Sequence, residues 1–76
     1  MLFRSIKASF VLTEFQGKIY ISARAIDEVN VQIIMERLGG GGHQNIAGAQ
    51  LADMTMSEAI NKLKEVLTKM TEEGAI

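Results

Sequence analysis

The chain has 76 residues, 47% of them hydrophobic, and a formal net charge of −1 from 8 basic and 9 acidic side chains. These values fit one small globular domain and exclude a disordered chain. They also exclude nucleic-acid binding driven by bulk positive charge, although a local basic site stays possible. The sequence has no cysteine, which excludes a disulfide scaffold, and no apolar run reaches the roughly 18 residues of a membrane span. We expect so small a chain to be a piece of a larger protein.

Two β-strands are predicted at the start of the chain. Apolar and polar residues alternate over residues 6–13 and again over residues 18–24, which is the pattern of half-buried strands. Gln16 and Gly17 between them are typical of a tight turn, so the two strands should form a hairpin. The second strand has one apolar row of side chains and one continuous polar row, which contains Lys18, Tyr20, Ser22 and Arg24.

Two helices and a third strand are predicted in the rest of the chain. Asn30 is a good N-cap for a helix whose apolar residues follow helical spacing as far as Leu38, and Gly39 should end it. Residues 47–51 are small and apolar and predict a third strand after a turn through residues 43–46. Thr55 and Glu58 form a capping-box pattern that opens a second amphipathic helix.

The predicted element order is β-β-α-β-α, which indicates an α+β fold. We expect a small mixed β-sheet in which the second strand, the first helix and the third strand form a right-handed crossover. Both helices should pack on one face of the sheet, and water or a partner lobe should cover the other face. Residues 1–5 find no partner in this scheme and are interpreted as the end of a preceding element, which leaves residues 6–76 as the domain.

The most informative segment is the run of four glycines, Gly39–Gly42, followed by His43. One interpretation is a flexible linker, but the run lies between a well-patterned helix and a strand, where disorder would cost stability. The alternative is that Gly40, Gly41 and Gly42 expose consecutive amides that bind an anion. A helix C-terminus repels phosphate, so such a site also needs a cation, and Arg24 is the best candidate because a guanidinium can bind a phosphate through two hydrogen bonds.

His43 is the only histidine, and two roles are open for it: a structural capping or packing group, or a hydrogen-bond donor to a phosphate or ribose. One imidazole without nearby carboxylates or thiolates is too few ligands for a metal ion. Ser22 and Asn45 are further polar candidates for the site, although Asn45 is also typical of a turn. No triad or carboxylate pair indicates a catalytic residue.

The segment ISARAIDEVNVQIIMERLGGGGH, which contains a Ser-x-Arg element and the GGGGH run, resembles the DHH-associated domain. That domain is the substrate-binding lobe of DHH-type phosphoesterases, and the likeness is strongest to the bacterial cyclic di-AMP phosphodiesterases. By position, Ser22 and Arg24 match the Ser-x-Arg element, while Gly40–Gly42 and His43 match the loop. The sequence departs from many members at Ile46, where they have an alanine.

The resemblance implies a cyclic dinucleotide or short nucleotide substrate, held by Arg24 and the glycine-rich loop. It also implies a partner in the same polypeptide, the DHH lobe, whose aspartates and histidines would hold manganese, whereas this chain holds no cofactor and should be inactive alone. The intact protein is expected at the bacterial cell membrane with its catalytic part in the cytoplasm, and this piece is expected to be soluble. The sequence does not fix the oligomeric state.

Two other functions stay open at this point. The same lobe could belong to an oligoribonucleotide or single-strand exonuclease of the DHH family, although the near-neutral charge disfavours a long nucleic-acid groove. The chain could also be a non-catalytic nucleotide-binding or protein-docking module with no hydrolytic partner.

Overall fold

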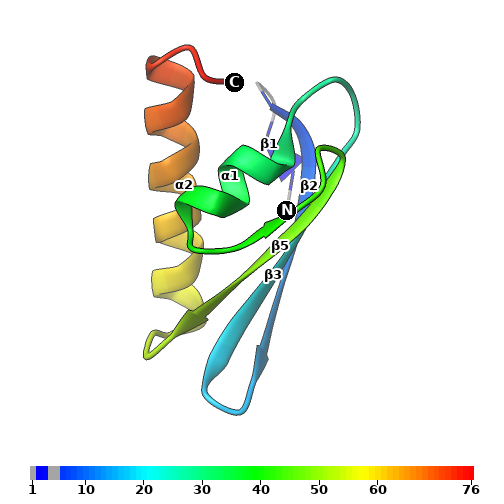
Figure 1. Ribbon diagram of the computed structural model, residues 1–76. Helices are drawn as coiled ribbons and strands as arrows, with labels where there is room; N and C mark the ends of the chain where they lie inside the picture. The colour runs from blue at the N-terminus through cyan, green and yellow to red at the C-terminus, as the bar shows by residue number, and fades with distance from the viewer. Residues whose placement is uncertain (1, 4–5) are drawn as a thin grey trace.

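The computed structural model describes residues 2–3 and 6–76, which form one five-stranded sheet with both helices on the same side (Figure 1). The strand order is β1-β2-β3-β5-β4. The α+β class and the placement of the two helices are as predicted. The elements in chain order are β1 (Leu2–Phe3), β2 (Ile6–Phe15), β3 (Lys18–Ala25), α1 (Val31–Arg37), β4 (Gly41–Gly42), β5 (Ile46–Ala52) and α2 (Met56–Glu72).

The predicted hairpin is confirmed, with longer strands than the alternation indicated. β2 and β3 pair from Ala8 opposite Ala25 to Phe15 opposite Lys18. The turn between them consists of Gln16 and Gly17, whose φ angles are 51° and 76°. Positive φ at both central residues is the geometry of a type I′ turn, which matches the twist of the flanking strands.

The pairing of β3 with the strand after α1 corrects the expected crossover. β5 lies beside β3 but runs antiparallel to it, and every other strand pair among the described residues is antiparallel as well. The expectation of a mixed sheet with a parallel crossover is therefore wrong. The antiparallel direction of β5 is explained by β4. Because β4 pairs antiparallel with β5, β4 runs in the same direction as β3. The crossover from β3 through α1 leads to these two glycines at the sheet edge, and β5 turns back between them and β3.

The start of the chain also differs from the expectation. Leu2 and Phe3 pair with β2, opposite Ser9 and Ile6, so this part of residues 1–5 does have a partner within the chain. Residues 1, 4 and 5 lie outside the described residues. The division of the chain at residue 6 stays a prediction.

Both helices begin where the sequence predicts. The Asn30 side chain accepts a hydrogen bond from the amide of Gln32 at the start of α1. At the start of α2 the Thr55 hydroxyl accepts from the amide of Glu58, and the Glu58 carboxylate accepts from the amide of Thr55. These bonds satisfy amides that have no partner within a helix, and they fix the first turns.

The core lies between the helices and one face of the sheet. Phe10 from β2 and Ile21 from β3 are buried there against Leu63 of α2 and Ile34 of α1. The remaining buried residues of this core are Ala8, Ile19, Ala23, Val31, Met35, Leu38, Ala47, Ala49, Leu51, Ala59, Leu67 and Met70.

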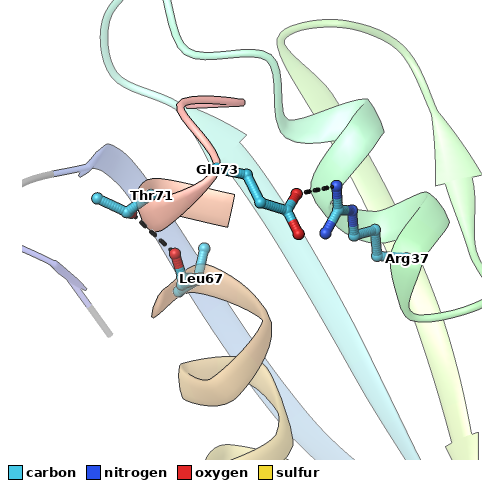
Figure 2. A network of polar contacts seen from close by, with 4 residues as sticks. All are labelled: Arg37, Leu67, Thr71 and Glu73. Carbon is cyan, nitrogen blue, oxygen red and sulfur yellow. Dashed lines mark hydrogen bonds and ion pairs between the residues drawn. The ribbon is translucent and has the colours of Figure 1, made fainter. Parts of the chain in front are cut away.

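An ion pair joins the ends of the two helices. Arg37, the last residue of α1, donates a hydrogen bond to the carboxylate of Glu73, directly after α2 (Figure 2). Within the last turn of α2, the Thr71 hydroxyl donates to the carbonyl of Leu67. The Arg37 bond lowers the pKa of Glu73, because it stabilises the carboxylate form.

Candidate functional site

The face of the sheet turned away from the helices is called the open face here. Side chains alternate between faces along a strand, so the neighbours of the buried residues in β2, β3 and β5 project onto this face. The pair registers align them in rows across the sheet. The open face consists of Lys7, Ser9, Val11, Thr13, Phe15, Lys18, Tyr20, Ser22, Arg24, Ile46, Gly48, Gln50 and Ala52.

The charges on the open face are all positive among the described residues of these strands. Lys7, Lys18 and Arg24 lie on it, whereas Glu14 of β2 alternates onto the opposite side. A chain with a net charge of −1 thus carries a cationic face. Lys7 is paired with Asp27 at 3.5 Å, but Arg24 is exposed and has no ion pair or hydrogen bond within the described part of the chain. Arg24 is therefore available to bind an anion.

From β4 to β3, the middle row of the open face is built from small residues. Gly41 of β4 lies opposite Gly48 of β5, Gly48 opposite Ser22 of β3, and Ser22 opposite Val11 of β2. Larger side chains stand in the rows on either side. The row of Arg24 and Ile46 is toward one end of the strands, and the row of Tyr20 and Gln50 is toward the other.

Two hollows lie along this face, and Ser22 lines both. The larger has a volume of about 560 Å³ and is lined by Tyr20, Ser22, Gln50 and the glycines 39, 40 and 48. The smaller, of about 370 Å³, is lined by Ser9, Val11, Arg24 and Ile46 together with Ser22. Both volumes are in the range of small-molecule sites, about 300–1,000 Å³. The structure therefore brings the predicted residues Ser22, Arg24 and Gly40 onto one hollowed, cationic surface.

Packing within the chain explains two glycines of the run. A Cβ added at Gly40 would lie 2.1 Å from the carbonyl oxygen of Gly48, so α1 can lead into β4 only through a residue without a side chain. Gly42 has a φ of +144°, and a Cβ there would lie 2.6 Å from the Cα of Ala47. The linker interpretation is therefore wrong for these positions, because the run is ordered by its contact with β5.

Gly41 has no such explanation. A Cβ added to it would meet nothing within 4 Å, and its φ is not in the left-handed region. It lies opposite Gly48 on the open face, at the end of the row that leads through Ser22. A glycine that the chain itself does not require leaves space for a ligand to approach the backbone.

Backbone bonding within the run corrects one expectation. The amide of Gly39 donates to the carbonyl of Glu36, that of Gly40 to Met35, and that of His43 to Ile46. Of the amides expected to bind an anion, that of Gly40 is engaged within the chain, so the expectation is wrong for Gly40, and it stays a prediction for Gly41 and Gly42. Charge for an anion must come mainly from side chains, foremost from Arg24.

His43 and Asn45 lie in the turn between β4 and β5. His43 is exposed and lines neither hollow, although its backbone continues the pairing opposite Ile46. The carbonyl of Asn45 accepts from the amide of Ala25, which anchors the turn to the end of β3. Asn45 lines a separate hollow beside Asp27 and Glu28, where acidic side chains disfavour phosphate. The contact of His43 and Asn45 with substrate stays a prediction.

Sequence analysis missed two residues of the larger hollow, Tyr20 and Gln50. They lie directly opposite each other on β3 and β5, and neither side chain makes a hydrogen bond within the described residues. The polar row of the second strand already placed Tyr20 beside Ser22. Gln50 could have been found from the alternation of Ala49, Gln50 and Leu51, but only with the register of β5 against β3.

The described residues contain neither a metal-ligand cluster nor a helix that could span a membrane. No group of three or more His, Cys, Asp or Glu side chains in residues 2–3 and 6–76 is placed to hold a metal ion. The residues present thus do not fit a manganese site. None of the helices described is long and apolar enough to cross a membrane.

Comparison with known proteins identifies relatives over nearly the whole chain. The family model described as the DHHA1 domain matches residues 4–73. The chain is 50% identical over 70 residues to the cyclic-di-AMP phosphodiesterase GdpP of Geobacillus thermodenitrificans, and 51% identical over 59 residues to the cyclic-di-AMP phosphodiesterase PdeA of Listeria monocytogenes. These matches cover 91% and 76% of this chain but only 11% and 9% of the relatives, so the chain spans about a tenth of their length.

A solved structure has the same fold. The pGpG-specific phosphodiesterase PggH of Vibrio cholerae superposes with a TM-score of 0.64 at 22% identity, and the match covers 87% of this chain and 24% of that one. At this identity the likeness supports the fold alone. The sequence relatives and the family model confirm the resemblance stated from the Ser-x-Arg element and the GGGGH run.

Proposed function

The chain belongs to the DHHA1 domain family, and from this premise we propose that it is the substrate-binding lobe of a phosphodiesterase that hydrolyses cyclic di-AMP. The observation that carries the proposal is Arg24 on the open face, which has no ion pair with the described residues and lies beside a hollow that Ser22 and Ile46 also line. Two relatives that are about half identical to this chain over the matched residues are named cyclic-di-AMP phosphodiesterases.

Arg24 and Ser22 are assigned to the phosphate. A guanidinium can donate two parallel hydrogen bonds to phosphate oxygens, and the Ser22 hydroxyl lies two residues away on the same face of β3. Gly41 and Gly48 continue the row from Ser22 and let the ligand approach the sheet closely. The glycine-rich loop thus contributes mainly by its lack of side chains, and Arg24 contributes the charge.

The hydrolytic chemistry is assigned to a separate DHH lobe of the intact protein. Two manganese ions held there would activate a water for attack on the phosphodiester. This chain binds and orients the nucleotide, and the described residues contain no metal-ligand cluster. We expect the chain alone, with manganese ions and cyclic di-AMP, to release no pApA above the rate in buffer. Turnover that is removed by a chelator would contradict this division of labour.

Binding of cyclic di-AMP to the chain tests the phosphate site. The Arg24→Ala variant should bind about tenfold more weakly or worse, because hydrogen bonds to charged groups contribute about 1.5–3 kcal/mol. Arg24→Lys should recover only part of the loss, since an ammonium group cannot form the paired bonds. Affinity is read by isothermal titration calorimetry or by NMR, with pApA as a second ligand.

Lys62→Ala is the matched control for this experiment. Lys62 is an exposed cation on α2, which covers the opposite face of the sheet, so its removal changes the net charge equally. Affinity should be unchanged in this variant. Equal losses in Arg24→Ala and Lys62→Ala would mean that only overall charge matters, and the assignment of Arg24 would be wrong.

A further inference from the structure

The larger hollow contains groups that the phosphate site does not use. Tyr20 and Gln50 face each other across β3 and β5, and their polar atoms have no partner within the described residues. Gly39, Gly40 and Gly48 line it without side chains, beside Ile21, Ser22 and Ala49, and the half-buried tyrosine ring borders a space of about 560 Å³. An aromatic ring and a free carboxamide beside such a space are the usual elements of a nucleobase site.

We propose that this hollow binds a nucleobase, stacked on Tyr20 and recognised at its edge by Gln50, with a preference for adenine. The inference rests on the proposed function, since it assumes that the ligand whose phosphate meets Arg24 is a nucleotide. It adds the site of the base and the two residues that select it, neither of which the phosphate site requires.

The spacing along β3 suits a nucleotide. Tyr20, Ser22 and Arg24 are alternate residues of one strand, so their Cα atoms are about 6.5 Å apart in succession. Ser22 lines both hollows and stands between the ring and the guanidinium. A phosphate near Ser22 lies within reach of the long Arg24 side chain, and the attached sugar and base then extend toward Tyr20.

The carboxamide of Gln50 accounts for the preference. A glutamine can accept a hydrogen bond from the N6 amino group of adenine and donate one to N7 at the same time, or to N1 on the other edge. Gln50 is exposed on β5 beside the hollow, and its side chain has no hydrogen bond to the described residues that a ligand would have to replace.

The test compares AMP, GMP, adenosine and inorganic phosphate as ligands of the chain, followed by NMR. Adenosine and AMP should shift the signals of Tyr20 and Gln50, inorganic phosphate should shift only those around Arg24, and AMP should bind more tightly than GMP. Tyr20→Ala should weaken AMP binding at least fivefold, in line with measured base stacking, while Tyr20→Phe should retain it. Phe15→Ala removes an exposed aromatic residue that lies on the same face but lines neither hollow, and AMP binding should not change.

The Gln50→Glu variant tests the edge recognition without removing the side chain. A carboxylate only accepts hydrogen bonds, so it suits the N1–H and N2–H groups of guanine and opposes the acceptor nitrogen of adenine. The ratio of AMP to GMP affinity should therefore fall at least fivefold, and Gln50→Ala should bring it close to one. Thermal unfolding of each variant checks that the fold is retained.

The outcomes separate this inference from the proposed function. If phosphate and AMP shift Arg24, but AMP and GMP bind equally and Tyr20→Ala changes nothing, the base site is overturned and the phosphate site stands. If Arg24 responds to no ligand while adenosine still shifts Tyr20 and Gln50, the proposed phosphate site fails and the base site is supported. Absence of any shift at Tyr20 with saturating adenosine and AMP overturns the inference.

Discussion

The strands β2, β3 and β5 have one face that is buried under the helices and one face that is exposed. On the helix-covered face, Phe10, Ile21 and Ala49 are buried under α1 and α2. On the open face, their neighbours Val11, Ser22 and Gln50 are exposed. The first face supplies the stability of a small domain by burying apolar area. The second face buries little apolar area, so its residues are not required for stability and are compatible with a role in binding.

This difference explains how a nearly neutral chain can present a cationic surface. The acidic residues lie on the helices, in the loops and on the helix side of β2, whereas Lys7, Lys18 and Arg24 lie on the open face. Composition averages over both faces. The sign of the charge at the site becomes visible only when the strand register separates one face from the other.

The largest expected difference between the two faces is in the effect of substitutions on the free energy of unfolding. Phe10→Ala should lower the free energy of unfolding by about 3–5 kcal/mol, because Phe10 is fully buried and the change leaves a cavity. Val11→Ala, one residue further along β2, should cost less than about 1 kcal/mol, because Val11 is 60% exposed. Urea unfolding of both variants gives the comparison, and equal losses would mean that the open face is covered within the chain.

A second pair of variants sharpens the comparison within the glycine run. Gly40→Ala should destabilise the chain by about 1–3 kcal/mol, because its Cβ would collide with the Gly48 carbonyl. Gly41→Ala meets only open space, so stability should be unchanged or slightly higher, while affinity for cyclic di-AMP should fall. Thermal unfolding and calorimetric titration measure both. A Gly41→Ala variant with wild-type affinity would remove Gly41 from the site.

The smallest expected effect concerns the helix side and its dependence on pH. Arg37 lowers the pKa of Glu73 chiefly through a side-chain hydrogen bond, and the Thr55 amide lowers the pKa of Glu58 in the same way. A carboxyl group with a lowered pKa in the folded state stabilises the fold above its ordinary value of 4.5, and this stability is lost as the pH falls through the folded-state pKa. Glu73→Gln should therefore lower the melting temperature slightly at pH 7.

The difference in melting temperature between this variant and the wild type should shrink as the pH falls through the folded-state pKa of Glu73. Glu72→Gln is the control, because Glu72 is the adjacent carboxylate and forms no ion pair among the described residues. An equal effect of both substitutions at pH 7 would show that the bond between Arg37 and Glu73 contributes nothing specific.

Local signals were sufficient for most of the fold. Asn30 and Thr55 mark helix starts because a side-chain oxygen there satisfies free amides, and Gln16–Gly17 marks the hairpin because both residues adopt positive φ. The direction of β5 could not be read in this way. It depends on β4, a two-residue strand made of glycines, which has no side-chain alternation to reveal it.

The site divides in a similar manner. Ser22 and Arg24, whose contact with substrate stays a prediction, could be proposed from the sequence because their row on one strand is polar and because the resemblance includes both residues. Gln50 was missed because its position beside Tyr20 is set by the pairing of β3 with β5. The engagement of the Gly39, Gly40 and His43 amides was also hidden, since backbone hydrogen bonds depend on the path of the chain and not on residue type.

The most direct test of the central claim is a titration of the methyl-labelled chain with cyclic di-AMP, followed by NMR. The methyl groups of Val11 and Ile46 report on the open face, and those of Leu63 and Leu67 report on the core beneath α2. We predict saturable shifts at Val11 and Ile46 that are lost in Arg24→Ala, with no change at Leu63 or Leu67. Shifts confined to the α2 methyl groups, or none at saturating ligand, would contradict the assignment of the open face as the nucleotide-binding surface.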